Sequence, residues 1–277
     1  MSFKVVVDSC CDLSAQMLKD PCFEKVPLSI CVNGQTFTDD LDFNQAELLW
    51  AMRQSEDAPS TSCPSPQAYL DAYQGADEIY VVTLSALLSG SHNSAEQARM
   101  MMEDEHPETD IHVFNSCSAA SGEVLVALKI QELASSGMPF KHVVREVEQF
   151  IYQLQTLVVL ESLDNLRKNG RLTKMQAAVT GALKIKLILG ATPEGEITKV
   201  GQALTIKQAL GKMVDRIAAD PDHKGRAVTI SHCNCLERAF QVKSMIEEKC
   251  SCTDIHILEA GGITTVYAND GGIVVSY

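Results

Sequence analysis

The hydroxyl-rich segment TSCPSP, at residues 61–66, is the first stretch of the sequence whose side chains could bind an anion. Two prolines keep a helix from starting early and Ser65 has the position of an N-cap, so Thr61 and Ser62 are expected in a rigid loop before a helix. Hydroxyl donors beside the positive end of a helix dipole favour a carboxylate or a phosphate. A simple capped turn explains the same residues, so the segment alone leaves both interpretations open.

A second polar segment, LLSGSHNSA at 87–95, follows the apolar run IYVVTL, which has the length and β-branched content of a buried parallel strand. Gly90 permits close backbone approach or a positive φ, and Ser89 and His92 place donors beside it. Open α/β sheets bind ligands at this end of their strands. The segment lacks the lysine and glycines of a P-loop and the G-x-S-x-G elbow of a serine hydrolase, which disfavours both classes.

A third segment, NLRKNGRLTK at 165–174, concentrates positive charge in a chain whose formal net charge is −13. Gly170 has the position of a helix C′ glycine that would turn the chain and project Arg171. The basic side chains are those of Arg167, Lys168, Arg171 and Lys174. They fit a solvated turn, and they also fit a site for a phosphate or for an acidic surface of a partner.

The composition narrows the class of protein. With 277 residues and 45% apolar residues, the chain is long enough for two domains with sizeable cores. Its acidity argues against nucleic acid or an anionic membrane as a partner, because these are bound through basic patches. We find no secretory signal and no apolar run near the roughly 18 residues of a membrane span. We therefore expect a cytoplasmic protein with no stable membrane insertion.

Ten cysteines require an explanation. Without an export signal, we expect reduced thiols that pack as small apolar groups. Two C-x-C pairs, Cys233 with Cys235 and Cys250 with Cys252, could make a four-thiolate zinc site, although structural zinc sites usually space their ligands as C-x2-4-C. We predict no bound metal.

Strand-like and helix-like patterns alternate along the chain, as in βαβ units. The strands expected in the first half are 3–9, 26–32, 79–85 and 111–116, and the helices are 43–54, 65–74, 94–105, 121–135 and 140–155. The strands expected in the second half are 156–162, 184–200 with a turn at 193–196, 226–232, 254–260 and 271–277, and the helices are 205–220 and 236–249. We predict an α/β protein with a parallel-sheet, Rossmann-like domain at 1–152 and a mixed-sheet α/β domain at 153–277. Polar residues at the strand ends, from Asp8 to Ser118, should share one edge of the first sheet.

Seven motifs occur in the order in which one protein family carries them: DSCCDLS, VPLSICVNGQTFTDDLDF, TSCPSP, VTLSALLSGSHNSAEQA, FNSCSAASGE, LDNLRKNGRLTK and LKIKLIL. From Asp8 to Leu189 the chain resembles the DegV family of bacterial fatty-acid-binding proteins. The resemblance implies a two-domain protein that holds a long-chain, palmitate-like fatty acid in an apolar tunnel, with no cofactor. It also implies that the carboxylate is held by the residues at the family's two hydroxyl loops, which are Thr61, Ser62, Ser89 and Gly90 here.

Some members of the family carry the acyl chain for a separate ATP-binding fatty-acid kinase subunit and are not themselves enzymes. Arg171 then becomes the candidate for docking that partner or for contacting the phosphoryl group. Three departures bear on the ligand head: Tyr267 stands where the family has histidine, Asn269-Asp270-Gly271 replaces G-P-G, and His92 replaces an aromatic residue. A further departure replaces I-K-P by Ile185-Lys186-Leu187. These changes leave the fold and the pocket in place but count against phosphotransfer. A divergent member that binds a lipid or a related acid without serving the kinase reaction is therefore an alternative to the acyl carrier.

Another class of function remains open at this stage, because related folds occur in enzymes that act on small phosphorylated or keto substrates. The acids that such an enzyme would need are available at Asp8, Asp39, Asp40 and Asp42. The segment TDDLDF also fits a polar turn at the start of a helix. A regulator that acts by binding other proteins is a third alternative, but the sequence contains no DNA-binding element that would support it.

Overall fold

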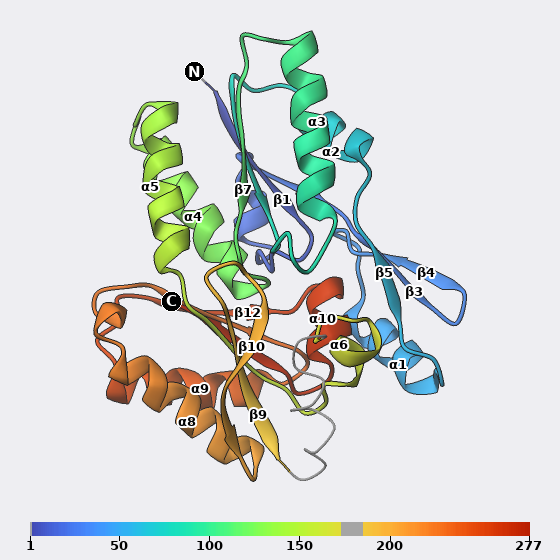
Figure 1. Ribbon diagram of the computed structural model, residues 1–277, viewed down its shortest axis with the longest axis vertical. Coiled ribbons are helices and arrows are strands. Elements are labelled where there is room, and N and C mark those ends of the chain that lie inside the picture. The colour runs from blue at the N-terminus through green and yellow to red at the C-terminus, as the bar shows by residue number, and fades with distance from the viewer. Residues whose placement is uncertain (1, 173–184) are drawn as a thin grey trace.

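The computed structural model describes residues 2–172 and 185–277, which form two α/β layers with a small third sheet beside them (Figure 1). Sheet A has the strand order β2 (Phe23–Val26), β1 (Phe3–Asp8), β6 (Glu78–Thr83) and β7 (Asp110–Asn115). All of its pairings are parallel. The first half is therefore the predicted Rossmann-like layer.

Both faces of sheet A are covered by helices, as its apolar strands require. Val6 and Val81 pack against α2 (Pro66–Ala72) and α3 (Ser91–Glu105). Val7 and Val82 point the other way, toward α4 (Ser121–Ser135) and α5 (Phe140–Gln153). Figure 1 shows the two helix pairs on opposite sides of the sheet. A short 3-10 turn, η1 (Met17–Lys19), connects β1 to β2.

Sheet C is the predicted mixed sheet. Its strand order is β10 (Ile197–Ala203), β9 (Lys186–Ala191), β8 (Thr156–Val159), β13 (Ile273–Ser276), β11 (Val228–His232) and β12 (Ile255–Glu259). Only β11 and β12 pair in parallel. The predicted hairpin is present, since β9 and β10 pair antiparallel and the turn closes with Thr192 N–H donating to Glu196 O at 2.8 Å.

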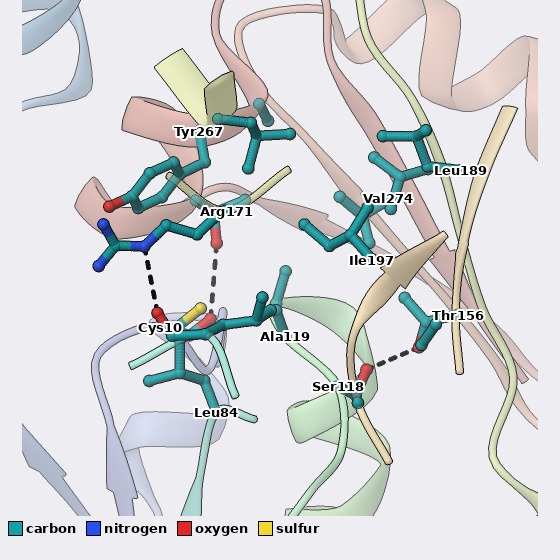
Figure 2. Close-up of a pocket in the computed structure, with 18 of the residues that line it drawn as sticks. Cys10, Leu84, Ser118, Ala119, Thr156, Arg171, Leu189, Ile197, Tyr267 and Val274 are labelled. Carbon is teal, nitrogen blue, oxygen red and sulfur yellow. Dashed lines mark hydrogen bonds between the residues drawn. The ribbon is translucent and has the colours of Figure 1, made fainter. Parts of the chain in front are cut away.

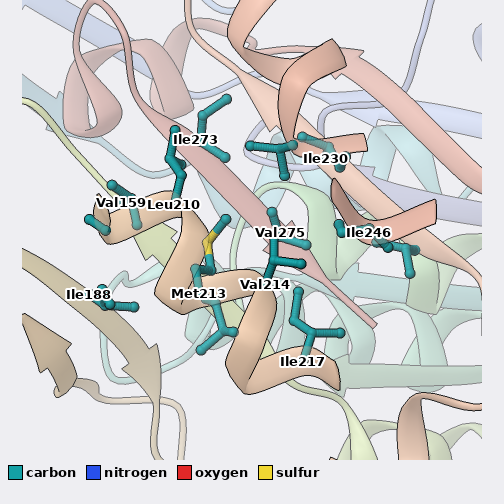
Figure 3. Close-up of a cluster of buried hydrophobic side chains, with 14 of the residues drawn as sticks. Val159, Ile188, Leu210, Met213, Val214, Ile217, Ile230, Ile246, Ile273 and Val275 are labelled. Atoms are coloured by element: carbon teal, nitrogen blue, oxygen red, sulfur yellow. The ribbon is translucent and has the colours of Figure 1, made fainter. Parts of the chain in front are cut away.

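Helices α8 (Ile206–Ala219) and α9 (Leu236–Lys249) cover one face of sheet C. Their apolar faces meet the sheet in a core where Met213, Ile217 and Ile246 lie against Ile188 and Val275 (Figure 3). A 3-10 turn, η3 (Pro221–His223), follows α8. The opposite face of the sheet meets the N-terminal end of α4, because Thr229 Oγ1 donates to Ser121 O at 2.9 Å.

One strand prediction was wrong. Residues 26–32 do not form one strand of the parallel sheet. Val26 ends β2, and Ser29 begins β3 (Ser29–Val32) in the antiparallel sheet B with β4 (Gln35–Thr38) and β5 (Ser60–Ser62). Pro27 explains the break, because proline has no N–H to continue the ladder. The next amide, that of Leu28, donates to the side chain of Ser9 at 3.0 Å instead.

Sheet B also contains Thr61 and Ser62, which were expected in a loop. They lie in a short edge strand, β5, in which Thr61 pairs with Ile30 and Ser62 with Ser29. They are therefore held by backbone pairing and not only by the prolines that follow. Helix α1 (Gln45–Gln54) lies beside this sheet, and Asn44 caps it by accepting from Glu47 N–H.

Helix α10 (Gly262–Ala268) has no counterpart among the predicted elements, because its β-branched, glycine-flanked sequence has little helical propensity. Tertiary contacts stabilise it. The buried Asp39 accepts from Gly262 N–H at 2.7 Å and from Ile263 N–H at 2.9 Å. Asp12 accepts from Gly261 N–H at 2.8 Å. Both carboxylates come from the first half of the chain, so α10 is bound across the two halves.

The predicted domain boundary between residues 152 and 153 stays a prediction. Elements up to α5 build sheets A and B, and β8 is the first strand of sheet C. The two halves of the chain are nevertheless in direct contact, because Asp12 and Asp39 of the first half bind the N-terminus of α10 in the second.

Burial raises the pKa of Asp12 to about 6, although hydrogen bonds such as that from Gly261 N–H act in the opposite direction. The neutral form of a buried acid with a raised pKa favours the fold, so this contribution is present at low pH and is lost as the pH rises through 6. We expect the difference in unfolding free energy between about pH 5 and pH 7.5 to shrink by about 1 kcal/mol in Asp12→Asn. Urea titrations of the wild type and of Asp12→Asn at both pH values measure this difference.

Asp104→Asn, which removes a carboxylate from the exposed end of α3, controls for the loss of a charge. If Asp12→Asn kept the pH dependence of the wild type, the buried acid would not be its source.

Candidate ligand-binding site

A cavity lies between the strand ends of the first half and sheet C, with about 820 Å³ of empty space including its opening to solvent. Most of its wall is apolar (Figure 2). The apolar side chains come from the first half (Leu84, Leu88, Ala119), from sheet C (Val158, Leu189, Ile197, Val274) and from the short helices between them (Leu166, Ile263, Ala268).

Arg171 and Tyr267 form a polar mouth on this cavity (Figure 2). The guanidinium carbon of Arg171 lies 5.7 Å from the centroid of the Tyr267 ring, within cation–π range. Arg171 Nε donates to Leu88 O at 3.2 Å, and the Tyr267 hydroxyl lies 2.8 Å from Thr61 Oγ1. The mouth therefore joins all three segments whose residue types suggested chemistry.

The turn that carries Arg171 has the predicted C′ glycine. Helix α6 (Asp164–Lys168) ends in a Schellman motif, in which Gly170 N–H donates to Arg167 O and Arg171 N–H donates to Leu166 O. Gly170 has φ +74°, a conformation that costs little only for glycine. The turn thus gives Arg171 a defined direction.

Two asparagines, neither of them predicted as a site residue, bind the same turn to its surroundings. Asn169 Nδ2 donates to Pro59 O at 3.0 Å, next to β5. Asn165 Nδ2 donates to Val266 O at 2.7 Å, on α10. Their position in the NLRKNGR segment was the only signal, because both partners are backbone atoms distant in sequence.

The two hydroxyl loops lie side by side. Gly90 has a negative φ of −74°, so of its two predicted roles only close approach applies: a Cβ at Gly90 would lie 3.1 Å from Cys63 Sγ. Ser65 is the predicted N-cap of α2 and accepts from Ala68 N–H at 3.2 Å. Ser89 Oγ accepts from Ser91 N–H at 3.2 Å.

The four residues expected to hold the carboxylate do not line the cavity itself. Ser89 and Gly90 line a shallower outer hollow, which shares Leu88 and Arg171 with the cavity. Ser62 is exposed, and Thr61 is connected to the cavity through its hydrogen bond to Tyr267. These residues therefore surround the mouth from outside.

His92 also lines the outer hollow, but as part of a helix. Helix α3 begins at Ser91, three residues before the predicted start, so His92 lies in its first turn. His92 Nδ1 lies 3.2 Å from Thr83 Oγ1. Burial lowers the pKa of His92, which favours the neutral ring at physiological pH.

The aspartates that an enzyme would need do not reach the cavity wall. Asp8 is buried and accepts from Leu84 N–H at 2.9 Å and from Ser91 Oγ at 2.6 Å, and burial raises its pKa. Asp39 binds the N-terminus of α10. Asp40 and Asp42 are exposed and form a turn in which Asp42 N–H donates to Asp40 Oδ1.

The two C-x-C pairs lie at opposite ends of α9, a helix of 14 residues, or about 21 Å. Within residues 2–172 and 185–277, no group of three or more His, Cys, Asp or Glu side chains could hold a metal ion. In the same ranges, no helix is both long and apolar enough to cross a membrane. Of the basic cluster, Arg167 pairs with Asp164 at 3.4 Å, and Lys174 lies outside the described residues.

The fold and the cavity define a two-domain α/β protein with a mostly apolar cavity under a mouth of hydroxyls and one arginine. The family model of DegV matches residues 2–277, so the chain belongs to the DegV family. A DegV domain-containing protein of Streptococcus gordonii is 35% identical over 279 residues, which span 100% of this chain and 99% of that protein.

Two solved structures are similar over the whole chain. A DegV family protein from Ruminococcus gnavus, refined with vaccenic acid, is 47% identical with a TM-score of 0.96, over 100% of this chain and 99% of that one. The fatty acid kinase (Fak) B3 protein of Streptococcus pneumoniae, loaded with linoleic acid, is 33% identical with a TM-score of 0.93, again over 100% and 99%.

Gly170 gives a test of how the mouth is built. Gly170→Ala should destabilise the protein by about 1 kcal/mol, because alanine resists a positive φ although nothing lies within 4 Å of its added methyl. Gly211→Ala, in the middle of α8 and equally free of contacts, should stabilise it by up to about 1 kcal/mol. Thermal unfolding should show a lower midpoint temperature for Gly170→Ala and a higher one for Gly211→Ala. Two shifts of the same sign would contradict the Schellman turn.

Proposed function

We propose that this protein binds a long-chain fatty acid, with the acyl chain in the cavity and the carboxylate at the mouth. The observation that carries the proposal is the largely apolar cavity that ends at Arg171 and Tyr267. Related proteins support it, because the R. gnavus and S. pneumoniae structures contain vaccenic and linoleic acid. The carboxylate would be held by Thr61, Ser62, Ser89 and Gly90.

The tail would supply most of the affinity, since each buried methylene contributes roughly 0.8 kcal/mol. The head group would set orientation. Hydroxyls can hold a carboxylate without a fully buried ion pair, whose loss would be costly each time the ligand leaves. Arg171 adds positive charge, while its Nε is already bonded to Leu88 O.

Tyr267 has a defined part in this arrangement. Its hydroxyl and that of Thr61 share one hydrogen bond, so one of the two protons remains free to donate to a carboxylate. A palmitate-like acid is the ligand we propose, with no cofactor. Tyr267 would thus take the place near the ligand head that histidine has in the family.

We also propose that the protein is a non-catalytic, cytoplasmic carrier that presents its fatty acid to an ATP-binding kinase subunit. The similarity to the fatty acid kinase B3 protein supports this. Arg171 would contact the partner or the phosphoryl group, because it lines both the cavity and the outer hollow. The half-exposed Arg167 and the exposed Lys168 extend the positive charge around it.

Native mass spectrometry of the purified protein, followed by organic extraction, tests the binding proposal. We expect one long-chain fatty acid per chain, because an apolar cavity does not hold ordered water and is open to an apolar ligand. A protein that is empty, and stays empty after incubation with a panel of fatty acids, would remove the proposal. The enzyme acting on a small phosphorylated or keto substrate would then be the leading alternative.

An acyl-phosphate assay with an ATP-binding fatty-acid kinase subunit tests the carrier proposal. We expect the loaded wild type to support acyl-phosphate formation and Arg171→Ala to lower the rate at least about tenfold, as for the loss of one charged contact. Arg145→Ala, which removes an exposed arginine from α5, should leave the rate unchanged. A loaded wild type that yields no acyl phosphate would mean that the protein binds lipid without serving this reaction.

A further inference from the structure

Two buried carboxyl groups lie behind the wall of the cavity. Asp8 is the last residue of β1 and Glu123 lies in the first turn of α4, and neither side chain is exposed to solvent. The two carboxyl groups are in hydrogen-bond contact with each other. The charges that act on Glu123 are those of Asp8 and Asp12, which are both negative. Two like charges so close together and so deeply buried are costly, which favours a proton on one of them.

This acid pair binds the backbone of three residues that line the cavity. Asp8 accepts from Cys10 N–H at 3.1 Å and from Leu84 N–H at 2.9 Å. Glu123 Oε1 accepts from Ala120 N–H at 3.1 Å. Cys10, Leu84 and Ala120 belong to three separate segments, which follow β1, follow β6 and precede α4. The pair therefore joins three parts of the cavity wall, of which Figure 2 labels Cys10 and Leu84.

The two carboxyl groups differ in the donors that surround them. Both oxygens of Asp8 accept from backbone N–H groups, and Ser91 Oγ also donates to Oδ2 at 2.6 Å. Glu123 Oε2 is buried, and no N–H or O–H group of the described residues donates to it. Only the thiol of Cys10, a weak donor, contacts the Glu123 carboxyl as well. A proton on Glu123 removes this deficit, because the acid then donates to the carboxylate of Asp8.

The electrostatic surroundings agree with this assignment of the proton. Burial raises the pKa of Asp8, while hydrogen bonds such as that from Ser91 act in the opposite direction. Burial raises the pKa of Glu123 well above its ordinary value, and the negative charge of Asp8 raises it further. The other titratable groups that interact with the pair supply no positive charge; they are Cys10, Cys11, Asp12 and Tyr69.

We propose that Glu123 is protonated and donates to an ionised Asp8, and that this shared proton positions three segments of the cavity wall for the ligand. Neither acid lines the cavity, so both are positioning residues that act through the backbone groups they bind. Ala120 shows why such support is needed, because its φ of +55° is unfavourable for a residue other than glycine. This inference rests on the proposed fatty-acid binding and identifies what holds its cavity in shape.

The first experiment measures the affinity for palmitic acid by displacement of a fluorescent fatty acid from full-length variants. Glu123→Ala should bind about tenfold more weakly than the wild type, because Asp8 and Ala120 N–H each lose a buried partner. Glu123→Gln should keep most of the affinity that Glu123→Ala loses, because an amide can both accept from Ala120 N–H and donate to Asp8. Asp8→Asn should lose at least about tenfold, because its NH₂ group must face a donor. The two amide variants are matched, since each removes one buried carboxyl.

The second experiment observes the proton directly and needs no ligand. At about pH 7.5, where ordinary carboxyl groups are ionised, the infrared difference spectrum between the wild type and Glu123→Gln should contain the carbonyl band of a protonated carboxylic acid. This band should shift in D₂O. A side chain that only fills space would not produce it, so the spectrum separates the proposed role from a merely structural one.

The outcomes separate this inference from the function on which it rests. A difference spectrum with carboxylate bands only would show that Glu123 is ionised and would overturn the inference. Equal losses in Glu123→Gln and Asp8→Asn, or a Glu123→Gln that does not fold, would contradict it as well. Circular dichroism shows which variants fold, and an Asp8→Asn that fails to fold while Glu123→Gln binds supports the assignment. A wild type that shows the acid band but binds no palmitic acid would overturn fatty-acid binding and leave the shared proton intact.

Discussion

The binding of Asp12 and Asp39 to the N-terminus of α10 is the interaction on which the site depends. Three backbone N–H groups, those of Gly261, Gly262 and Ile263, donate to these carboxylates. Carboxylate oxygens are strong acceptors for such groups, and the helix dipole favours negative charge there. At Asp12 burial outweighs both effects, since its pKa is raised. Lys25 Nζ, 3.5 Å from Asp39 Oδ1, offsets part of the cost of burying the charge.

That interaction places residues from the end of the chain beside residues from its start. Helix α10 brings Ile263 and Ala268 to the cavity wall and Tyr267 to its mouth. From there Tyr267 meets Thr61 of sheet B and Arg171 of the glycine turn. Without α10 in this position, the wall that faces Leu84 and Leu88 would be open.

Hydroxyl side chains occur in two different environments in this molecule, around the mouth of the cavity and deep between α4 and sheet C. Around the mouth, Thr61 and Ser89 are partly exposed and belong to a short edge strand and a short loop. Deep in the molecule, the hydroxyls of Ser118, Thr156, Ser276 and Ser121 are bonded to one another and join α4 to sheet C.

The sequence by itself determined the local elements and the class of protein. The sequence predicted α4 and α9 with their observed bounds. It predicted α5 and α8 to within two residues, because an apolar face repeating at helical spacing has few alternative structures. The glycine turn at Gly170 followed from local chemistry in the same way. The family followed from motifs that keep their order, and the hydroxyl loops were recognisable because their residue types are unusual at a strand end.

Only the tertiary structure decided how these pieces meet. Pro27 moved residues 29–32 into another sheet, and α10 forms because carboxylates more than 200 residues away in sequence bind its first turn. The bonds from Asn169 to Pro59 and from Tyr267 to Thr61 could not be foreseen either. Local propensity acts over a few residues, whereas these contacts pair groups whose separation in sequence carries no signal; packing alone determines which of them meet.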